Sequence, residues 1–184
     1  MSSLMPLVHV SVEDYLEGEK TGPVRHEYVA GQVFAREGVS ARHNGIALNL
    51  ATRFRRHVRG GPCRVFMSAM KVRIEALDLF YYPDVIVSCD PEDRAEFFVN
   101  RPCLIVEVTS PSTEATDRRE KLLAYIKLDS LREYVLIAED EVKADVYHRD
   151  EKGYWWFETL TEIDELRMES VGLNIPLLEL YEDI

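Results

Sequence analysis

The chain has 184 residues, of which 46% are apolar and 30% charged, so it has the balance of a folded protein and a length that suits one domain, residues 1–184. No apolar run is long enough to span a bilayer, and the first residues lack the basic and apolar segments of a secretory signal. The net charge of −11 counts against a broadly basic surface for nucleic acid, because binding to phosphates needs local positive charge.

The cysteine content predicts thiols rather than disulfides. Cys63, Cys89 and Cys103 lie in or beside apolar segments, and no pair has CxxC spacing. An odd and sparse set of this kind is typical of reduced, buried thiols in a cytoplasmic protein. The sequence does not support a structural zinc site.

The first half of the chain predicts a short helix, a hairpin and a long helix. Ser11-Val12-Glu13-Asp14 resembles a capping box, which predicts a helix over residues 11–18. Residues 26–35 predict two strands joined around Gly31. Residues 41–59 predict an amphipathic helix, because apolar side chains recur every four residues at Ile46, Leu50, Phe54 and Val58.

The rest of the chain predicts short strands around one further helix. Strands are expected at residues 63–68, 70–76, 82–88, 104–108, 133–139, 142–149 and 153–160. The segment 110–117 predicts a loop that ends at a capping Asp117, followed by a helix over 117–128. This order predicts an α/β or α+β fold with a mixed sheet, in which 104–108 and 133–138 are parallel neighbours joined by a right-handed crossover.

Two of the apolar strands carry a carboxylate. Strand alternation places Asp84 on the face of Ile86, and Glu107 on the face of Ile105. An ionised carboxylate away from water costs several kcal/mol unless a cation, backbone donors or a metal ion compensates it. Two acids on one sheet could together hold Mg²⁺, which prefers carboxylate oxygens. Alternatively, both acids lie at strand ends, where water or a salt bridge satisfies them.

Lys121 is the candidate cation for the same region. It lies four residues after Asp117 and four before Tyr125, so the three share one face of the predicted helix. The apolar stripe of that helix is expected at Leu122 and Ile126, with Lys121 at its flank, where the ammonium group can reach the strand ends. The alternative is a surface pair with Asp117, worth about 0.3–0.5 kcal/mol.

The segment from YPDVIV through PCLIVEVTSPSTEATDRREKLLAYIKLDSLREYVLI resembles the Uma family of restriction endonucleases, a branch of the PD-(D/E)XK nuclease superfamily. The matching positions are Pro83-Asp84, Glu107-Val108, Ser110-Pro111-Ser112-Thr113, Asp117, Lys121 and Glu133-Tyr134, with weaker similarity in HEYVAGQV and ARHNGIALNL. The resemblance implies a restriction-endonuclease-like core, a mixed sheet flanked by helices. It also implies a metal-dependent endonuclease that hydrolyses phosphodiester bonds, with DNA as the expected substrate, and a homodimer.

The resemblance assigns roles to particular residues. Asp84, Glu107 and the Val108 carbonyl would hold Mg²⁺ or Mn²⁺, and Lys121 would act on the attacking water. The superfamily's usual lysine position, two residues after the glutamate, is Thr109 here, so the helix would supply the lysine.

Two residues of the N-terminal half remain open between two interpretations. Glu27 is either a further acid of the site or an exposed hairpin residue. His43 matches a family histidine near the start of the long helix, where packing or a place in the first turn is its commoner role.

Other interpretations remain open. The acidic total also fits a catalytically inactive nuclease fold that serves as a binding or assembly module. A serine nucleophile in SPST lacks a nearby histidine and a GxSxG elbow. The arginines of residues 53–64 form either a phosphate-facing surface or a solvated helix face. The second interpretation is preferred, because runs of charge are usually solvated. The aromatic run 154–157 predicts core packing that alternates with an edge or dimer contact.

Overall fold

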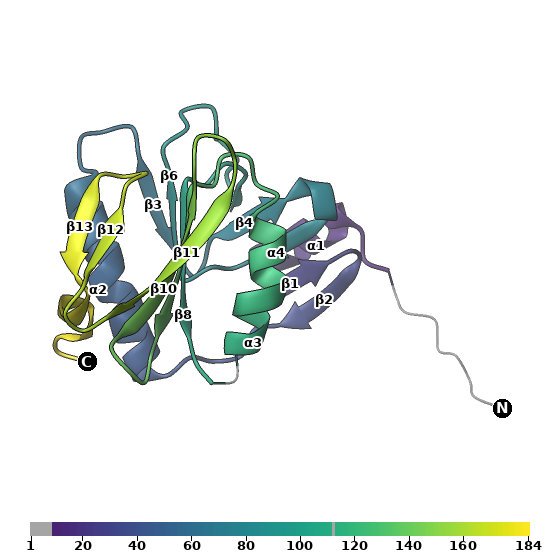
Figure 1. Ribbon diagram of the computed structural model, residues 1–184. Coiled ribbons are helices and arrows are strands. Elements are labelled where there is room, and N and C mark those ends of the chain that lie inside the picture. The colour runs from purple at the N-terminus through teal and green to yellow at the C-terminus, as the bar shows by residue number, and fades with distance from the viewer. Residues whose placement is uncertain (1–8, 112) are drawn as a thin grey trace.

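The largest sheet of the protein has six strands in the order β11-β10-β9-β8-β6-β3 (Figure 1). The structure is a computed structural model that describes residues 9–111 and 113–184. The six strands are β3 (Arg64–Met67), β6 (Val85–Ser88), β8 (Leu104–Thr109), β9 (Glu133–Ala138), β10 (Lys143–Arg149) and β11 (Trp155–Thr161). Strands β8 and β9 are parallel, whereas the other neighbouring pairs are antiparallel. The mixed α+β fold and the parallel pair predicted from the sequence are therefore confirmed.

Helix α2 (Ala41–His57) covers one face of this sheet. The Ser40 hydroxyl caps it by accepting a hydrogen bond from His43 N at 3.0 Å. Its apolar stripe packs in one core with the sheet and with a C-terminal unit that the sequence did not predict. That unit consists of β12 (Glu165–Met168), β13 (Leu173–Pro176) and the short 3₁₀ helix η3 (Leu177–Tyr181).

The other face is covered by a helical segment and by a second sheet (Figure 1). The helical segment runs through α3 (Glu114–Thr116), the π-helical turn η2 (Asp117–Lys121) and α4 (Leu122–Tyr125). The second sheet has the order β2-β1-β5-β4-β7. Its strands are β1 (His26–Val29), β2 (Gln32–Ala35), β4 (Lys71–Ile74), β5 (Leu79–Tyr81) and β7 (Phe98–Val99), with α1 (Val12–Thr21) and the 3₁₀ helix η1 (Glu75–Leu77) beside them. The predicted hairpin is present as β1 and β2.

Successive residues of β6 point to opposite faces of the large sheet. Val85 and Val87 lie in the core beneath α2, and Ile86 lies in the core on the other side. In β8, Ile105 shares the Ile86 side. The alternation expected from the sequence is therefore confirmed within these strands, and Glu107 lies on the side of the helical segment, where it contacts Lys121 and Tyr125.

The helical segment differs from its prediction at both ends. It begins at Glu114 and ends at Tyr125, so Asp117 lies inside it and is not its cap. Its buried apolar residues are Ala124 and Tyr125, with Leu128 after its end, whereas the predicted stripe residues are only half-buried. The π-helical turn explains the change, because the extra residue in the turn rotates the following face relative to α-helical periodicity.

The prediction of three reduced cysteines is wrong. Cys63 and Cys89 form a disulfide, and Cys103 is free, with its Sγ 3.5 Å from Cys89 Sγ. The antiparallel register of β3 and β6 pairs Arg64 with Ser88, so the next residues outward face each other. Pairing across 26 positions leaves no local sequence signal. Disulfides are uncommon in cytosolic proteins, so the cysteines lend no support to a cytoplasmic location.

Strand β11 forms an edge of the large sheet. Tyr154, Trp156 and Phe157 are exposed; Trp156 stacks on His148 and Phe157 packs on Tyr147. The edge position predicted for the aromatic run is thus confirmed, whereas most of its side chains lie outside the core, where the sequence had predicted alternate packing. Among the helices of the described residues, none is long and apolar enough to cross a membrane.

Candidate active site

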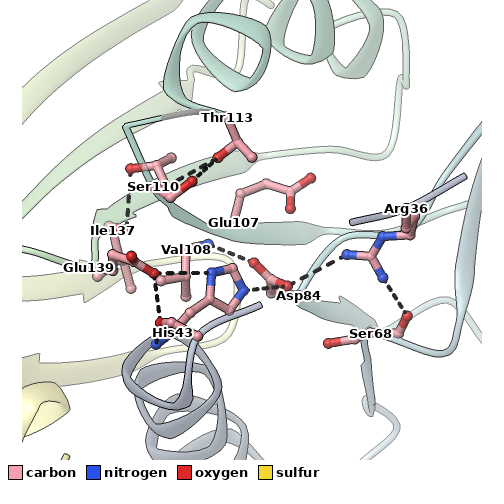
Figure 2. A network of polar contacts seen from close by, with 12 residues as sticks. Arg36, His43, Ser68, Asp84, Glu107, Val108, Ser110, Thr113, Ile137 and Glu139 are labelled. Atoms are coloured by element: carbon pink, nitrogen blue, oxygen red, sulfur yellow. Dashed lines mark hydrogen bonds and ion pairs between the residues drawn. The ribbon is translucent and has the colours of Figure 1, made fainter. Parts of the chain in front are cut away.

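The Asp84 carboxylate lies buried at the entrance to β6, one residue before the strand begins. Its Oδ2 accepts a hydrogen bond of 2.8 Å from Val108 N, in the neighbouring strand β8. Its Oδ1 faces His43 Nε2 at 3.0 Å and Arg36 Nη2 at 3.9 Å (Figure 2). The Asp84 carboxylate is therefore held at the end of the large sheet, and its Oδ1 faces the guanidinium group of Arg36 and the imidazole ring of His43.

Glu107 lies in β8 and is also buried. Its Oε1 accepts hydrogen bonds of 3.0 Å from Lys121 Nζ and of 3.0 Å from the Tyr125 hydroxyl. Burial raises the pKa of Glu107 to about 8, and the charge of Lys121 opposes this rise. Of the alternative interpretation, water does not satisfy the buried Glu107, whereas a salt bridge to Lys121 does.

Lys121 connects the carboxylates of this region. Its Nζ lies 2.9 Å from Asp117 Oδ1, 3.0 Å from Glu107 Oε1 and 3.8 Å from Glu27 Oε1. Burial lowers the pKa of the ammonium group, but the charges of Glu107 and Asp117 outweigh this effect and hold it above its ordinary value. Both Lys121 and Asp117 are buried, so the alternative of an exposed surface pair is wrong.

Glu27 enters the site from the second sheet. Its carboxylate in β1 is only 20% exposed and faces Lys121 Nζ, and Oε1 lies 3.5 Å from the Tyr82 amide nitrogen, which donates to it. The exposed-hairpin interpretation does not fit this position. The two sheets therefore contribute acids to one place, and the helical segment supplies the lysine between them.

These side chains line one cavity of about 440 Å³ at the carboxyl ends of the parallel strands β8 and β9. That is where ligands bind in many α/β proteins. The cavity is acidic. Its ionisable lining residues among those described are Glu27, Glu37, Asp84, Glu107, Asp117 and Glu139, against Arg36, Lys121 and His43.

Sequence reasoning missed Arg36 and Glu139, among other residues of the cavity, and it left open whether His43 belongs to the site. Arg36 follows β2, and its Nη1 donates a hydrogen bond of 3.0 Å to the Ser68 carbonyl. Glu139 follows β9, and its carboxylate accepts a hydrogen bond of 3.1 Å from Ser40. Of these three residues only His43 had a sequence signal, its match to a family histidine, and the sequence alone did not decide its role.

The Ser-Pro-Ser-Thr segment also borders the cavity, through Ser110 and Thr113; Ser112 lies outside the described residues. The Ser110 amide donates to the Thr113 hydroxyl at 3.2 Å, and Glu114 N donates to the Ser110 carbonyl at 2.9 Å. These contacts form the turn that leads into the helical segment.

The arginine run lies away from this cavity. Arg55 and Arg56 are in the last turn of α2, whereas His43 is in its first turn, and at about 1.5 Å per residue the two ends are about 18 Å apart. Arg53 is engaged with Glu179 in an ion pair of 2.6 Å. This geometry favours the solvated-face interpretation of the run.

The donor chemistry fits a hard divalent cation. Within residues 9–111 and 113–184, no group of three or more His, Cys, Asp or Glu side chains is already arranged to hold a metal ion. Mg²⁺, however, needs only one or two carboxylates and keeps several waters. Two buried atoms of residues that line the cavity, His43 Nε2 and Asp117 Oδ1, make close contacts with Asp84 and Lys121 but no hydrogen bond of good geometry within the described residues. Asp84 and Glu107 are therefore suitable ligands, and a cation would offset the excess of carboxylates.

The fold and site define a class of α+β protein in which an acidic cavity at the end of a mixed sheet contains one buried lysine. Residues 12–177 match the model of the Uma2 family, which is described as "putative restriction endonuclease". The chain belongs to this family, and the resemblance inferred from the sequence is confirmed.

Two curated relatives come from Synechocystis. The uncharacterised protein slr1290 is 37% identical over 180 residues, covering 97% of this chain and 95% of the relative. The uncharacterised protein sll1609 is 27% identical over 157 residues, covering 84% and 87%. A crystal structure from Anabaena variabilis, described as a "putative nuclease" belonging to DUF820, has a TM-score of 0.73 at 18% identity, over 90% of this chain and 96% of that one. At this identity the likeness shows a common fold.

Proposed function

We propose that this protein is a divalent-cation-dependent endonuclease that hydrolyses phosphodiester bonds, with DNA as its substrate. The observation that carries the proposal is the pair of buried carboxylates, Asp84 and Glu107, beside the charged Lys121 in one cavity. Membership of the Uma2 family and the fold shared with the Anabaena protein both support a nuclease role.

Asp84 and Glu107 would hold Mg²⁺ or Mn²⁺, with the Val108 carbonyl as a further ligand and Glu27 as an additional acid. When bound, such an ion supplies a Lewis acid that polarises the phosphate and stabilises charge on the leaving oxygen. The Val108 amide fixes the Asp84 carboxylate through its hydrogen bond to Oδ2, which leaves Oδ1 directed into the cavity.

Lys121 would stabilise negative charge at phosphorus and orient the attacking water. Its raised pKa keeps the ammonium group protonated, so it is a hydrogen-bond donor and a positive charge rather than a base. Tyr125 positions Glu107 by donating to the same oxygen as the lysine.

The test is cleavage of supercoiled plasmid, single-stranded DNA and single-stranded RNA in Mg²⁺ or Mn²⁺, with EDTA as the blank. We expect nicking of the plasmid that falls at least about 10²-fold in Asp84→Asn and Glu107→Gln. Matched controls are Asp129→Asn and Glu141→Gln, which make the same changes at exposed carboxylates and should cleave like the wild type.

Cleavage that survives in an Asp84→Asn, Glu107→Gln, Lys121→Met triple variant would refute the assignment. Stoichiometric binding of Mn²⁺ without cleavage of any substrate would favour the alternative of an inactive nuclease fold that acts as a binding or assembly module. Sedimentation of the free protein and of its DNA complex tests the homodimer that the family resemblance implies.

A further inference from the structure

His43 presents a buried ring nitrogen to the proposed cation site. The residue is 8% exposed, and its Nε2 lies 3.0 Å from Asp84 Oδ1. The contact is outside hydrogen-bonding geometry, and Nε2 has no hydrogen-bond partner among the described residues. A buried polar nitrogen that makes no hydrogen bond costs about 1–3 kcal/mol, so its position beside the Asp84 carboxylate needs a physical reason.

The distance between the two atoms matches that between neighbouring ligands of one metal ion. Ligands bound at about 2.1 Å and at right angles to each other lie about 3.0 Å apart. Asp84 Oδ1 is also available, since the carboxylate accepts its hydrogen bond from Val108 through Oδ2. Arg36 approaches Oδ1 only to 3.9 Å and is held by the Ser68 carbonyl.

The other side of the ring faces a carboxylate. His43 Nδ1 lies 3.8 Å from Glu139 Oε2 (Figure 2). The Ser40 hydroxyl donates a hydrogen bond of 3.1 Å to the same oxygen. Ser40 also accepts a hydrogen bond from the His43 amide, so the cap of α2 fixes the histidine and its neighbouring carboxylate together. A carboxylate behind the ring is the usual arrangement at histidines that bind metals, because it sets the tautomer and the orientation of the ring.

We propose that His43 Nε2 is a ligand of the divalent cation that the proposed function places on Asp84. His43 and Asp84 are the pair already at ligand spacing, whereas Glu107 Oε1 is bound to Lys121 until a cation competes for it. An imidazole nitrogen beside carboxylates favours Mn²⁺ and Co²⁺ over Mg²⁺, which prefers oxygen ligands. The site would therefore select a transition metal, with His43 as the residue that determines this choice.

The test is pulsed electron paramagnetic resonance of Mn²⁺ bound to the full chain without nucleic acid. We expect the electron spin echo of Mn²⁺ to be modulated by a ¹⁴N nucleus bound directly to the metal. In protein grown with ¹⁵N-histidine this signal should be replaced by a ¹⁵N coupling. His43→Gln should abolish it, and the control His57→Gln, at the exposed end of α2, should retain it. By calorimetry, His43→Gln should weaken Mn²⁺ binding at least about 10-fold and Mg²⁺ binding much less.

The outcomes separate this proposal from the nuclease proposal. Absence of Mn²⁺ binding, absence of a nitrogen coupling in the wild type, or a coupling that persists in His43→Gln overturns the ligand assignment. Plasmid cleavage without the nitrogen coupling overturns the assignment of His43 as a ligand but supports the nuclease proposal. The nitrogen coupling without cleavage supports the assignment of His43 and counts against the nuclease proposal. If His43→Gln fails to fold, the isotope exchange in the wild type decides, because His43 is the one histidine among the described residues that line the cavity.

Discussion

Replacing Lys121 by methionine removes the positive charge between the buried acids of the cavity. At an effective dielectric constant of about 20, a unit charge 3.0 Å from Glu107 contributes about 5 kcal/mol of attraction, and Asp117 at 2.9 Å contributes a similar amount. Desolvation of the lysine offsets much of this attraction. Measured losses on breaking buried pairs give the better guide, and we expect Lys121→Met to lower the free energy of unfolding by about 3–5 kcal/mol.

Urea unfolding in EDTA at pH 9, where Glu107 with its pKa of about 8 is ionised, measures this loss, which corresponds to a midpoint lower by about 1–2 M. Adding Glu107→Gln to the variant removes one uncompensated carboxylate, so the double variant should be more stable than Lys121→Met by about 1–3 kcal/mol. The control is Lys20→Met, which breaks the exposed 2.6 Å pair with Glu17 and should leave the midpoint unchanged within error.

Mn²⁺ extends the same experiment. A cation bound at the carboxylates takes over the compensation that the lysine supplied, so Mn²⁺ should raise the unfolding midpoint of Lys121→Met more than that of the wild type. The reasoning is refuted if Lys121→Met unfolds at the wild-type midpoint, or if Glu107→Gln makes the variant less stable. Either result would mean that Lys121 does not compensate the carboxylate.

Two further predictions concern regions outside the cavity. Cys89→Ser removes the disulfide across 26 positions and should lower the free energy of unfolding by about 3–4 kcal/mol through loop entropy. In the control Cys103→Ser, reductant should still lower the melting temperature, because the disulfide is intact. Equal melting temperatures of the wild type and Cys89→Ser would contradict this prediction. Burial lowers the pKa of His148, but Glu133 and then Glu158 outweigh it and raise that pKa. The stabilisation is therefore complete below about pH 6.5 and is lost as the pH rises through the higher folded-state value, so His148→Gln should lower the urea midpoint more at pH 6 than at pH 9.

The local parts of this structure could be predicted because single segments determine them. The four-residue spacing that begins at Ile46 predicted α2, and alternation placed Ile86 and Val87 on opposite faces. The family motif indicated which acids to examine, and the structure brings Asp84 and Glu107 to one cavity with Lys121.

The rest depends on contacts between distant segments. Glu139 and His43 lie 96 positions apart and meet only because α2 begins where β9 ends. Likewise, a π-helical turn has no periodicity that distinguishes it from an α-helix in a 12-residue segment, so the sequence placed the apolar stripe at Leu122 and Ile126, which are only half-buried. Pairing of Cys63 with Cys89 follows from strand register, which the sequence did not specify.

The cavity in which the proposed chemistry occurs is acidic, as is the chain as a whole. In the described part of the chain, six carboxylates line the cavity and only two permanently charged bases, Arg36 and Lys121, accompany them. A phosphodiester would be repelled from such a cavity unless a divalent cation neutralises it first. With the arginines at the far end of α2, few phosphates would contact fixed positive charges near the site. Binding of DNA should then depend steeply on the cation and only weakly on monovalent salt, because the salt dependence follows the number of phosphates neutralised by the protein. The net charge of −11 is thus compatible with a nuclease whose substrate affinity comes from the bound ion.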